Sequence, residues 1–229
     1  MPLSFVSTPV RILCKGILFD MDGILISSLG SVERSWTQWA NLRGIDPAYA
    51  CKTAHGCRSI ETVAKLRPDL DSEAENKIVE DLEVADTEGI AVLPGALHLL
   101  MALPGGSWTV VTSATDRLAR VRLAAAGVPV PARLVTADSV TEGKPSPAPF
   151  LAGAALLGLP PQQCVVFEDS SSGARAGRAA GCTVVATPFS HPIESLRAAH
   201  FLIQDLTAVT VESLPGGEGL ALKLMPMAG

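Results

Sequence analysis

Short apolar runs recur along the chain at intervals that predict the strands of a sheet. They are rich in Val, Ile and Leu and do not alternate between apolar and polar residues, a pattern typical of strands covered on both faces. The predicted strands are Gly16–Phe19, Trp108–Thr112, Arg133–Val135, Cys164–Phe167, Thr183–Ala186 and Phe201–Ile203. The pattern therefore predicts a parallel sheet buried inside the protein.

Helical patterns separate these strands. The predicted helices, each followed by a glycine, are Asp116–Ala126, Pro147–Leu157 and Ser172–Ala180. Glycine is a common residue directly after a helix because it adopts the left-handed conformation that ends the last turn. The alternation of strand and helix predicts an α/β fold with a Rossmann-like, doubly wound parallel sheet.

Residues 27–91 depart from this alternation. They contain no convincing strand, and the helices predicted there are Ser31–Arg43, Ser59–Leu66 and Ser72–Thr87. We expect this segment to form an all-helical cap domain inserted after the first strand, while residues 1–26 and 92–229 form the α/β core domain. Within the core, Ala208–Met225 is expected to form a short hairpin around Pro215–Gly217.

Composition narrows the class of protein. The chain has 229 residues, 48% of them hydrophobic, and a formal net charge of −5 without the basic stripe that a nucleic-acid partner requires. Arg11 and Lys15 interrupt the apolar character of the N-terminus, which argues against a signal peptide or membrane anchor and predicts a cytoplasmic protein. The five cysteines, an odd number without a CxxC pair, are interpreted as thiols and not as disulfides or a zinc site.

The predicted strands end on polar residues. Asp20 and Asp22 follow the first strand, Thr112 and Ser113 end the second, and Glu168–Asp169 end the fourth. Ligands of open α/β sheets bind at the carboxyl ends of the strands, so these side chains are expected to share one site. A single aspartate at such an end is more often a helix cap, but three ends together argue for a site.

These residue types suit phosphoryl transfer. An attacking carboxylate and a phosphate are both anionic, so a cation must lie between them, and Mg²⁺ with carboxylate ligands from Asp20, Asp169 and Glu168 is the expected choice. Lys144 and the hydroxyl of Ser113 can stabilise the remaining phosphate charge. Asp22 can face the other side of the phosphorus and act as the acid and then the base.

Four segments resemble, in order and spacing, the motifs of the haloacid dehalogenase (HAD) superfamily. They are FDMDG around Asp20, VVTSATD around Ser113, GKPSPAPF at Lys144 and VFEDSSSGARAG around Asp169. The ordered set is specific, and the resemblance covers essentially the whole chain, including the helical insertion. Dehalogenases of this superfamily lack the second aspartate of the first motif, so its presence as Asp22 argues for a phosphatase.

The resemblance also implies a role for each motif residue. Asp20 would be the nucleophile and Asp22 the general acid/base, and Ser113 and Lys144 would hold the phosphate. Mg²⁺ would bind the side chains of Asp20 and Asp169 and the backbone carbonyl of Asp22, with Glu168 as a further candidate ligand. A monomer is the expected state, and a small phosphorylated metabolite is the expected partner.

The insertion resembles those of sugar-phosphate and polyol-phosphate phosphatases, such as the 2-deoxyglucose-6-phosphate and glycerol-phosphate phosphatases. The stretches that carry this likeness are SVERSWTQWA, HGCRSIETVAKLRPDL and TEGIAVLPGA. His55 and Arg58 would then lie in a cap loop that faces the active site, where either could contact sugar hydroxyls or the phosphate. The alternative, a helix-end histidine and a surface arginine, is about equally well supported.

Some positions differ from the family pattern. Ile24 replaces a frequent threonine, and Ser27 replaces a frequent aspartate. Ala114, which is expected to be part of the phosphate-binding site, replaces a frequent glycine and would tighten the backbone around the phosphate. None of these differences removes a group that performs the chemistry, so they bear on rate and substrate range.

Several residues are expected to be structural. Trp36 and Trp39 are expected to pack within the cap, and Ser170 to Ser172 to begin a helix. Arg120 and Arg122 are placed on a solvated helix face.

Two other functions stay open: a phosphomutase of the same superfamily, and a catalytically silent binder of phosphorylated ligands.

Overall fold

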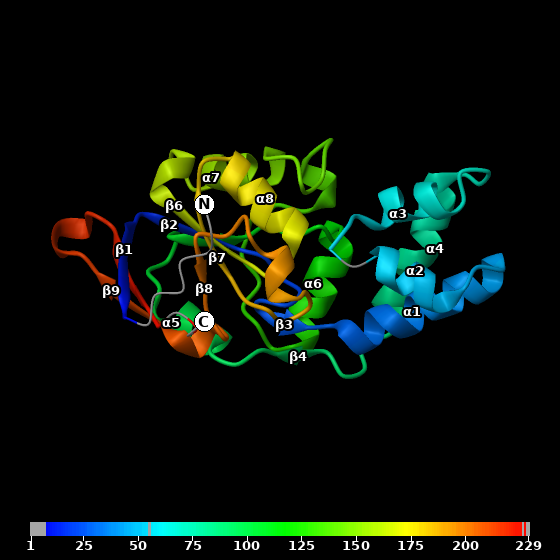
Figure 1. The fold of residues 1–229 in the computed structure, drawn as a ribbon, viewed down its shortest axis with the longest axis horizontal. Helices are drawn as coiled ribbons and strands as arrows, with labels where there is room; N and C mark the ends of the chain where they lie inside the picture. The colour runs from blue at the N-terminus through cyan, green and yellow to red at the C-terminus, as the bar shows by residue number, and fades with distance from the viewer. Residues whose placement is uncertain (1–7, 55, 226, 228–229) are drawn as a thin grey trace.

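The computed structural model describes residues 8–54, 56–225 and 227, and its centre is a parallel sheet of five strands in the order β5–β2–β6–β7–β8 (Figure 1). The strands are β2 (Gly16–Phe19), β5 (Trp108–Val110), β6 (Cys164–Glu168), β7 (Thr183–Ala186) and β8 (Phe201–Leu202). Every residue of β2 and β6 is buried. The predicted α/β fold is confirmed, but the strand expected at Arg133–Val135 forms only a single bridge, between Val111 and Val135.

Helices cover both faces of this sheet. The core helices are α5 (Ala96–Ala102), α6 (Asp116–Ala125), α7 (Ala148–Leu156) and α8 (Ser171–Ala179). Successive side chains of a strand point to opposite faces, and accordingly Ile17 and Phe19 of β2 join an apolar cluster with α5 and α6. Leu18 joins a second cluster with α7 and α8. The sheet is therefore doubly wound, as the sequence predicts.

A second, antiparallel sheet lies beside the core in the order β1–β10–β9. Its strands are β1 (Val10–Cys14), β9 (Val209–Ser213) and β10 (Leu220–Leu224). The expected C-terminal hairpin is thus confirmed, with a short 3-10 turn at Pro215–Gly217 between its strands. Strand β1 was not predicted, and it pairs with β10 from the opposite end of the chain. The remaining 3-10 turns are Ala137–Ser139, Pro161–Gln163, Ile193–Ser195 and Leu206–Ala208.

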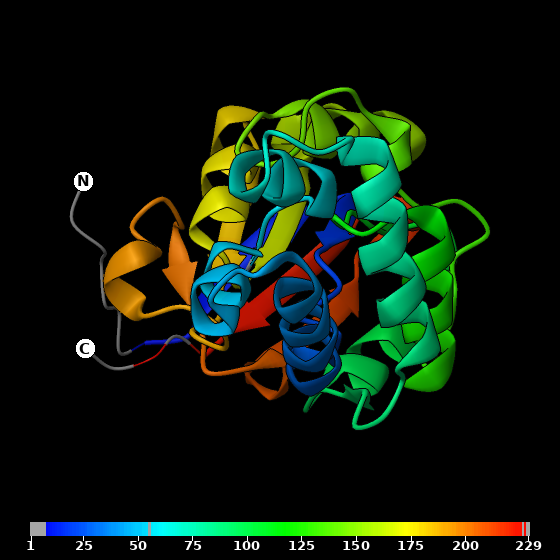
Figure 2. The ribbon, with the colours of Figure 1, turned by 90° about the vertical axis from the view of Figure 1, so that its right-hand side faces the viewer.

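Four helices form the inserted cap, which projects from one end of the core (Figure 1) and faces the viewer in Figure 2. They are α1 (Leu29–Arg43), α2 (Pro47–Ala54), α3 (Ser59–Leu66) and α4 (Ser72–Ala85), of which α2 was not predicted. Trp36 and Trp39 of α1 are buried in an apolar cluster of the cap, edge to face at 5.4 Å between ring centroids. The indole Nε1 of Trp39 also donates a 2.8 Å hydrogen bond to Oε2 of Glu75. The expected packing role of both tryptophans is confirmed.

The chain passes between core and cap through two short strands that pair with each other. Strands β3 (Ile26–Ser27) and β4 (Ala91–Val92) form an antiparallel pair in which Ile26 lies opposite Val92. The expected division into residues 1–26 and 92–229 on one side and 27–91 on the other cuts the chain within this pair, and the division itself stays a prediction.

The structure also bears on two features considered in the sequence, membrane-spanning segments and disulfides. No helix in the described part of the chain is both long enough and apolar enough to cross a membrane. No disulfide forms among the described residues, which include all five cysteines. Burial raises the pKa of the Cys182 thiol to about 12, as it does for Cys14, so these two cysteines stay protonated at neutral pH.

Candidate active site

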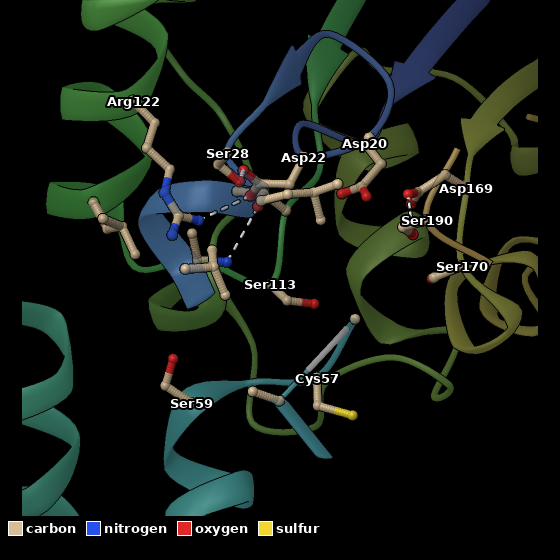
Figure 3. A pocket seen from close by; sticks show the side chains of 18 of the residues that line it. Asp20, Asp22, Ser28, Cys57, Ser59, Ser113, Arg122, Asp169, Ser170 and Ser190 are labelled. Carbon is tan, nitrogen blue, oxygen red and sulfur yellow. Dashed lines mark hydrogen bonds and ion pairs between the residues drawn. The ribbon is translucent and has the colours of Figure 1, made fainter. Parts of the chain in front are cut away.

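The polar ends of the core strands converge on one pocket between core and cap. Asp20 follows β2, Thr112 and Ser113 follow β5, and Asp169 follows β6; all of them line this pocket. Residues of the cap, among them Cys57, line its opposite side (Figure 3). The parallel strands therefore bring together side chains that lie far apart in the sequence, as expected.

Lys144 connects two of the strand ends. Its Nζ lies 2.8 Å from Oδ1 of Asp20 and 2.6 Å from Oε1 of Glu168, and the lysine side chain is only 2% exposed. Burial alone disfavours an ammonium group, but the carboxylates of Asp20 and Glu168 outweigh it and raise the pKa of Lys144 above its ordinary value. The site therefore holds a permanent positive charge beside Asp20.

Glu168 organises the turn that leads into α8. Its Oε2 accepts hydrogen bonds of 2.9 Å from the backbone amides of Asp169 and Ser170 and from the hydroxyl of Ser170. Ser170 is also the N-cap of α8 and accepts a bond from the amide of Gly173, which confirms the expected helix start. A Cβ at Gly173 would lie 1.7 Å from Oε1 of Glu168, so only glycine lets the helix approach this carboxylate. Both oxygens of Glu168 are thus engaged by the protein.

Three buried carboxylates form the only cluster of possible metal ligands among the described residues. Oxygens of Asp20, Glu168 and Asp169 lie within 4.8 Å of one another. Burial, together with the charge of Glu168, raises the pKa of Asp20 to about 7 and that of Asp169 well above its ordinary value. One lysine does not balance this concentration of negative charge. The donor set, hard carboxylate oxygens in need of positive charge, therefore fits a cation such as Mg²⁺.

The turn after β2 packs directly against this cluster. Gly23 has a φ of +84°, and a Cβ there would lie 1.9 Å from Oδ2 of Asp169. Any larger residue would have to displace the carboxylate, so glycine is required by both conformation and space. The hydroxyl of Ser190 donates a hydrogen bond to the same oxygen of Asp169 and also contacts Nδ1 of His191. Ser190 could not be placed in the site from the sequence, because it precedes a loop without any motif.

Asp22 is held from two directions. Ser28 Oγ donates a 2.5 Å hydrogen bond to Oδ1, and Nη1 of Arg122 lies 3.1 Å from Oδ2 (Figure 3). Nη2 of Arg122 contacts Oε1 of Glu83, on cap helix α4, at 3.2 Å. The expectation that Arg122 faces solvent is therefore wrong: its side chain is 5% exposed and lines the pocket. Arg120 does lie at the surface, paired with Asp116.

Ser113 and Ala114 both line the pocket, as expected of residues that bind the phosphate. The backbone amide of Ala114 donates to Oγ1 of Thr112 at 3.1 Å, which fixes the turn between β5 and α6. Thr115 then caps α6 by accepting from the amide of Leu118. The phosphate-binding role of Ser113, Ala114 and Lys144 stays a prediction.

The two cap residues proposed to contact substrate have different outcomes. His55 lies outside the described residues. Arg58 does not line the pocket; its guanidinium donates 2.9 Å hydrogen bonds to the backbone carbonyls of Ala137 and Thr141 in the core. It thus ties the cap loop to the core and is not turned toward a substrate, because two core carbonyls outside the pocket engage its donors. Cap residues that sequence analysis did not place in the site, namely Trp36, Cys57, Ser59 and Glu83, line the pocket.

The raised pKa of Asp20 predicts how stability depends on pH in the metal-free protein. The pKa of Asp20 is about 7 in the folded protein, whereas the usual pKa of an aspartate is 3.8. The stability that comes from this proton is complete below about pH 4 and is lost as the pH rises toward 7. Asp20→Asn lacks this loss, so its free energy of unfolding is expected to rise relative to that of the unaltered protein between pH 4 and pH 7, by on the order of 1 kcal/mol or more, and its melting temperature with it.

Thermal unfolding of both proteins after removal of metal measures this difference. Asp205→Asn, a change in a turn outside the pocket where the carboxylate caps the backbone of Thr207, is the matched control for the loss of a carboxylate. A gap between Asp20→Asn and the unaltered protein that stays constant or shrinks toward pH 7 would contradict the prediction.

The chain is similar to several known proteins over most of its length. The family model for haloacid dehalogenase-like hydrolases matches residues 14–181. Hexitol phosphatase A of Escherichia coli is 41% identical over 90% of this chain and 97% of its own. Glycerol-1-phosphate phosphohydrolase 2 of Saccharomyces cerevisiae is 31% identical over 85% of this chain and 83% of its own. The structure of CbbY from Rhodobacter sphaeroides in complex with xylulose-1,5-bisphosphate is 26% identical, with a TM-score of 0.74, over 85% of this chain and 95% of its own.

Proposed function

Since the chain belongs to the haloacid dehalogenase-like hydrolase family and is a phosphatase, we propose that it hydrolyses the phosphate monoester of a sugar or polyol, with Mg²⁺ as cofactor and an aspartyl-phosphate on Asp20 as intermediate. The observation that carries this proposal is the convergence of the four motifs on one pocket. Asp20, Asp22, Ser113, Lys144 and Asp169 all line it.

Asp20 is the nucleophile of the proposed reaction. One of its oxygens, Oδ1, accepts from Lys144, which leaves Oδ2 to attack the phosphorus. As the new bond from Oδ2 to phosphorus forms, the bond from phosphorus to the oxygen of the leaving alcohol breaks. Lys144 and the hydroxyl of Ser113 are placed to stabilise the charge on the phosphate oxygens during this transfer.

Asp22 transfers the protons. It follows Asp20 by two residues, and its side chain is 32% exposed, so it is accessible to a substrate in the pocket. In the first step it donates a proton to the oxygen of the leaving alcohol. In the second step the resulting carboxylate accepts a proton from water as that water attacks the phosphorus, which releases inorganic phosphate and restores Asp20.

Asp20 and Asp169 would hold Mg²⁺ with their side chains, and Asp22 would contribute its backbone carbonyl. Glu168 is less suited to direct coordination, because Lys144 and three donors of its own turn already engage its oxygens. When bound, Mg²⁺ supplies positive charge that lets the carboxylate of Asp20 and an anionic phosphate approach each other.

The pocket lining favours a substrate with one phosphate and an uncharged remainder. Lys144 and Arg122 are the cations among the described lining residues, and each already pairs with two carboxylates. Neither is left for a second anionic group, and the carboxylate of Glu83 would repel one. Hydroxyls such as that of Ser59 and apolar surface such as that of Trp36 suit a polyhydroxylated carbon chain.

A panel of phosphate esters tests this proposal. Hexitol phosphates and glycerol 1-phosphate are expected to have values of kcat/KM about tenfold to a hundredfold larger than those of sugar bisphosphates and phosphoglycolate. This range corresponds to a cost of about 1.4–2.8 kcal/mol for an anionic group without a partner in the pocket. The measurement is release of inorganic phosphate in the presence of Mg²⁺. Equal or faster hydrolysis of the esters with a second anionic group would contradict the charge argument.

The same panel separates the other functions. A phosphomutase would need an activating bisphosphate and would return the phosphoryl group to the sugar without net release of phosphate. A silent binder would release none from any ester, with or without an activator. Release from simple monoesters alone, with no activator present, supports the phosphatase.

A further inference from the structure

Arg122 is a buried cation at the boundary between core and cap. It belongs to α6 of the core, is 4% exposed, and lies between the carboxylates of Asp22 and Glu83. Burial raises the pKa of the Glu83 carboxyl, and the charge of Arg122 opposes this effect. A buried arginine is stable only when its charge is balanced, and here one balancing group comes from the catalytic loop and the other from the cap.

This contact is the innermost of three polar contacts between α6 and cap helix α4, which lie side by side in Figure 2. Thr115 Oγ1 donates to Oε1 of Glu80 at 2.7 Å, and Arg117 pairs with Asp81 at the surface. Only the third contact, from Arg122 to Glu83, is fully buried and continues to a residue of the proposed reaction. The position of α4 is therefore connected to Asp22 through a single guanidinium group.

The guanidinium group suits this connection. Its N–H donors form a rigid planar fork, so two carboxylates that engage different nitrogens fix its orientation. Asp22 itself is one-third exposed and could adopt several rotamers, but the hydroxyl of Ser28 and Nη1 of Arg122 each hold one of its oxygens. Ser28 is fixed at the start of α1, and Arg122 is fixed by Glu83.

We propose that Arg122 is a positioning residue for proton transfer: it orients the carboxylate of Asp22, and Glu83 of the cap fixes Arg122 in turn, so that the placement of the cap and the placement of the acid/base group are coupled. This inference rests on the proposed function, in which Asp22 protonates the leaving alcohol. Its consequence is that loss of Arg122 impairs the steps that need a proton and spares the transfer that does not.

Comparison of two leaving groups tests this role in Arg122→Met. The alkoxide of glycerol 1-phosphate needs a proton as it leaves, whereas the p-nitrophenolate of p-nitrophenyl phosphate is stable as an anion. We expect the rate of single-turnover transfer from glycerol 1-phosphate to fall by about tenfold to a hundredfold, toward the loss in Asp22→Asn, since general acid catalysis contributes about 10²–10⁴-fold. The rate of single-turnover release of p-nitrophenolate should stay within about threefold of that of the unaltered protein.

Each outcome decides a different point. Equal losses with both substrates indicate a damaged fold or phosphate site and overturn the positioning role, as do unchanged or faster rates with glycerol 1-phosphate. Arg120→Met, on the exposed side of the same helix, is the matched control and should behave as the unaltered protein. If rapid quenching of the unaltered protein traps no phosphate bound covalently to Asp20 with either ester, the aspartyl-phosphate of the proposed function fails, and not this inference.

The coupling to the cap has its own test, which begins with a variant that leaves Arg122 in place. Glu83→Gln keeps the shape of the side chain and removes its charge, and we expect a several-fold loss of transfer from glycerol 1-phosphate with little change in KM. The double variant should be no slower than Arg122→Met, because both changes break one connection. Losses that multiply in the double variant would show that Glu83 and Arg122 act separately and would overturn the coupling.

Discussion

Asp20→Asn is expected to abolish phosphate release, with kcat falling by about four to six orders of magnitude, as is typical when the nucleophile of a covalent mechanism is removed. Asparagine cannot form the phosphorylated intermediate, although its carbonyl oxygen can still accept from Lys144. The measurement is steady-state release of phosphate from the best monoester, together with a search for phosphate covalently bound to the protein. Retention of most of the activity would exclude Asp20 as the nucleophile.

The fold of Asp20→Asn should stay intact. Asp20 shares Lys144 with Glu168 and lies close to Asp169, so the substitution removes one of three crowded negative charges and leaves the pair of Lys144 with Glu168 in place. We therefore expect an unchanged circular dichroism spectrum and an equal or higher melting temperature without metal. A lower melting temperature would mean that the lost activity reflects lost structure. Asp205→Asn, in a turn outside the pocket, should keep full activity.

Removal of the metal is expected to have an effect of similar size. With EDTA the rate should fall to background, because the carboxylate of Asp20 and the phosphate would meet without a cation to balance them. Mg²⁺ should also stabilise the folded protein: at one hundred times its Kd a ligand contributes about 2.7 kcal/mol, which corresponds to a rise of about 5–10 °C in melting temperature for a chain of this length. Both values can be measured on one preparation.

Asp169→Asn is the control for the metal site. Asp169 is buried and accepts from Ser190, so asparagine keeps the shape and one acceptor but loses a charged ligand. The stabilisation by Mg²⁺ should become much smaller in this variant, whereas Glu212→Gln, on strand β9 of the second sheet, should show the full effect. Full activity in EDTA, or an equal shift in Asp169→Asn, would contradict the assigned metal site.

The strand ends could be predicted because both of their signals are local. Gly16–Phe19 is a buried apolar run that stops at a charged residue, and the structure ends β2 at the same position. Helix α3 likewise begins and ends where expected, at Ser59 and Leu66. Parallel pairing then brings the carboxyl ends of the strands together, so the positions of Asp20, Ser113 and Asp169 around one pocket followed without any knowledge of side-chain contacts.

The parts that could not be predicted depend on partners far along the chain. Strand β1 contains Arg11 and gave only a weak apolar signal, and its pairing with β10 decides that it is a strand. Arg122 did carry a local signal, because it follows the buried Leu118 by four residues and so lies on the same face of α6. Its charge nevertheless predicted a solvent-exposed position, because the contact that balances this charge inside the protein is not visible in the sequence. That contact is the carboxylate of Glu83, on a helix of the cap.

Arg58 shows the opposite difficulty. Its place in a loop beside the pocket was predicted, but the direction of its side chain depends on the backbone carbonyls of Ala137 and Thr141, which lie about eighty residues further along. Backbone acceptors leave no trace in the sequence, so a cation near a phosphate site is easily assigned to the substrate when it in fact holds the cap to the core.

The pairing of β3 with β4 has a consequence for how such a protein can diversify. Because Ile26 lies opposite Val92, the two ends of the insertion are neighbours, and the core closes around them whatever the segment between them contains. The residues that we propose perform the hydrolysis lie outside that segment, whereas Trp36, Cys57 and Ser59 of the pocket lining lie inside it. We therefore expect that exchange of one helical module for another would change the substrate range. Glu83 sets a limit on such exchanges. A transplanted module without an equivalent carboxylate would leave the buried charge of Arg122 balanced by Asp22 alone, so we expect Glu83 and Arg122 to be retained or lost together.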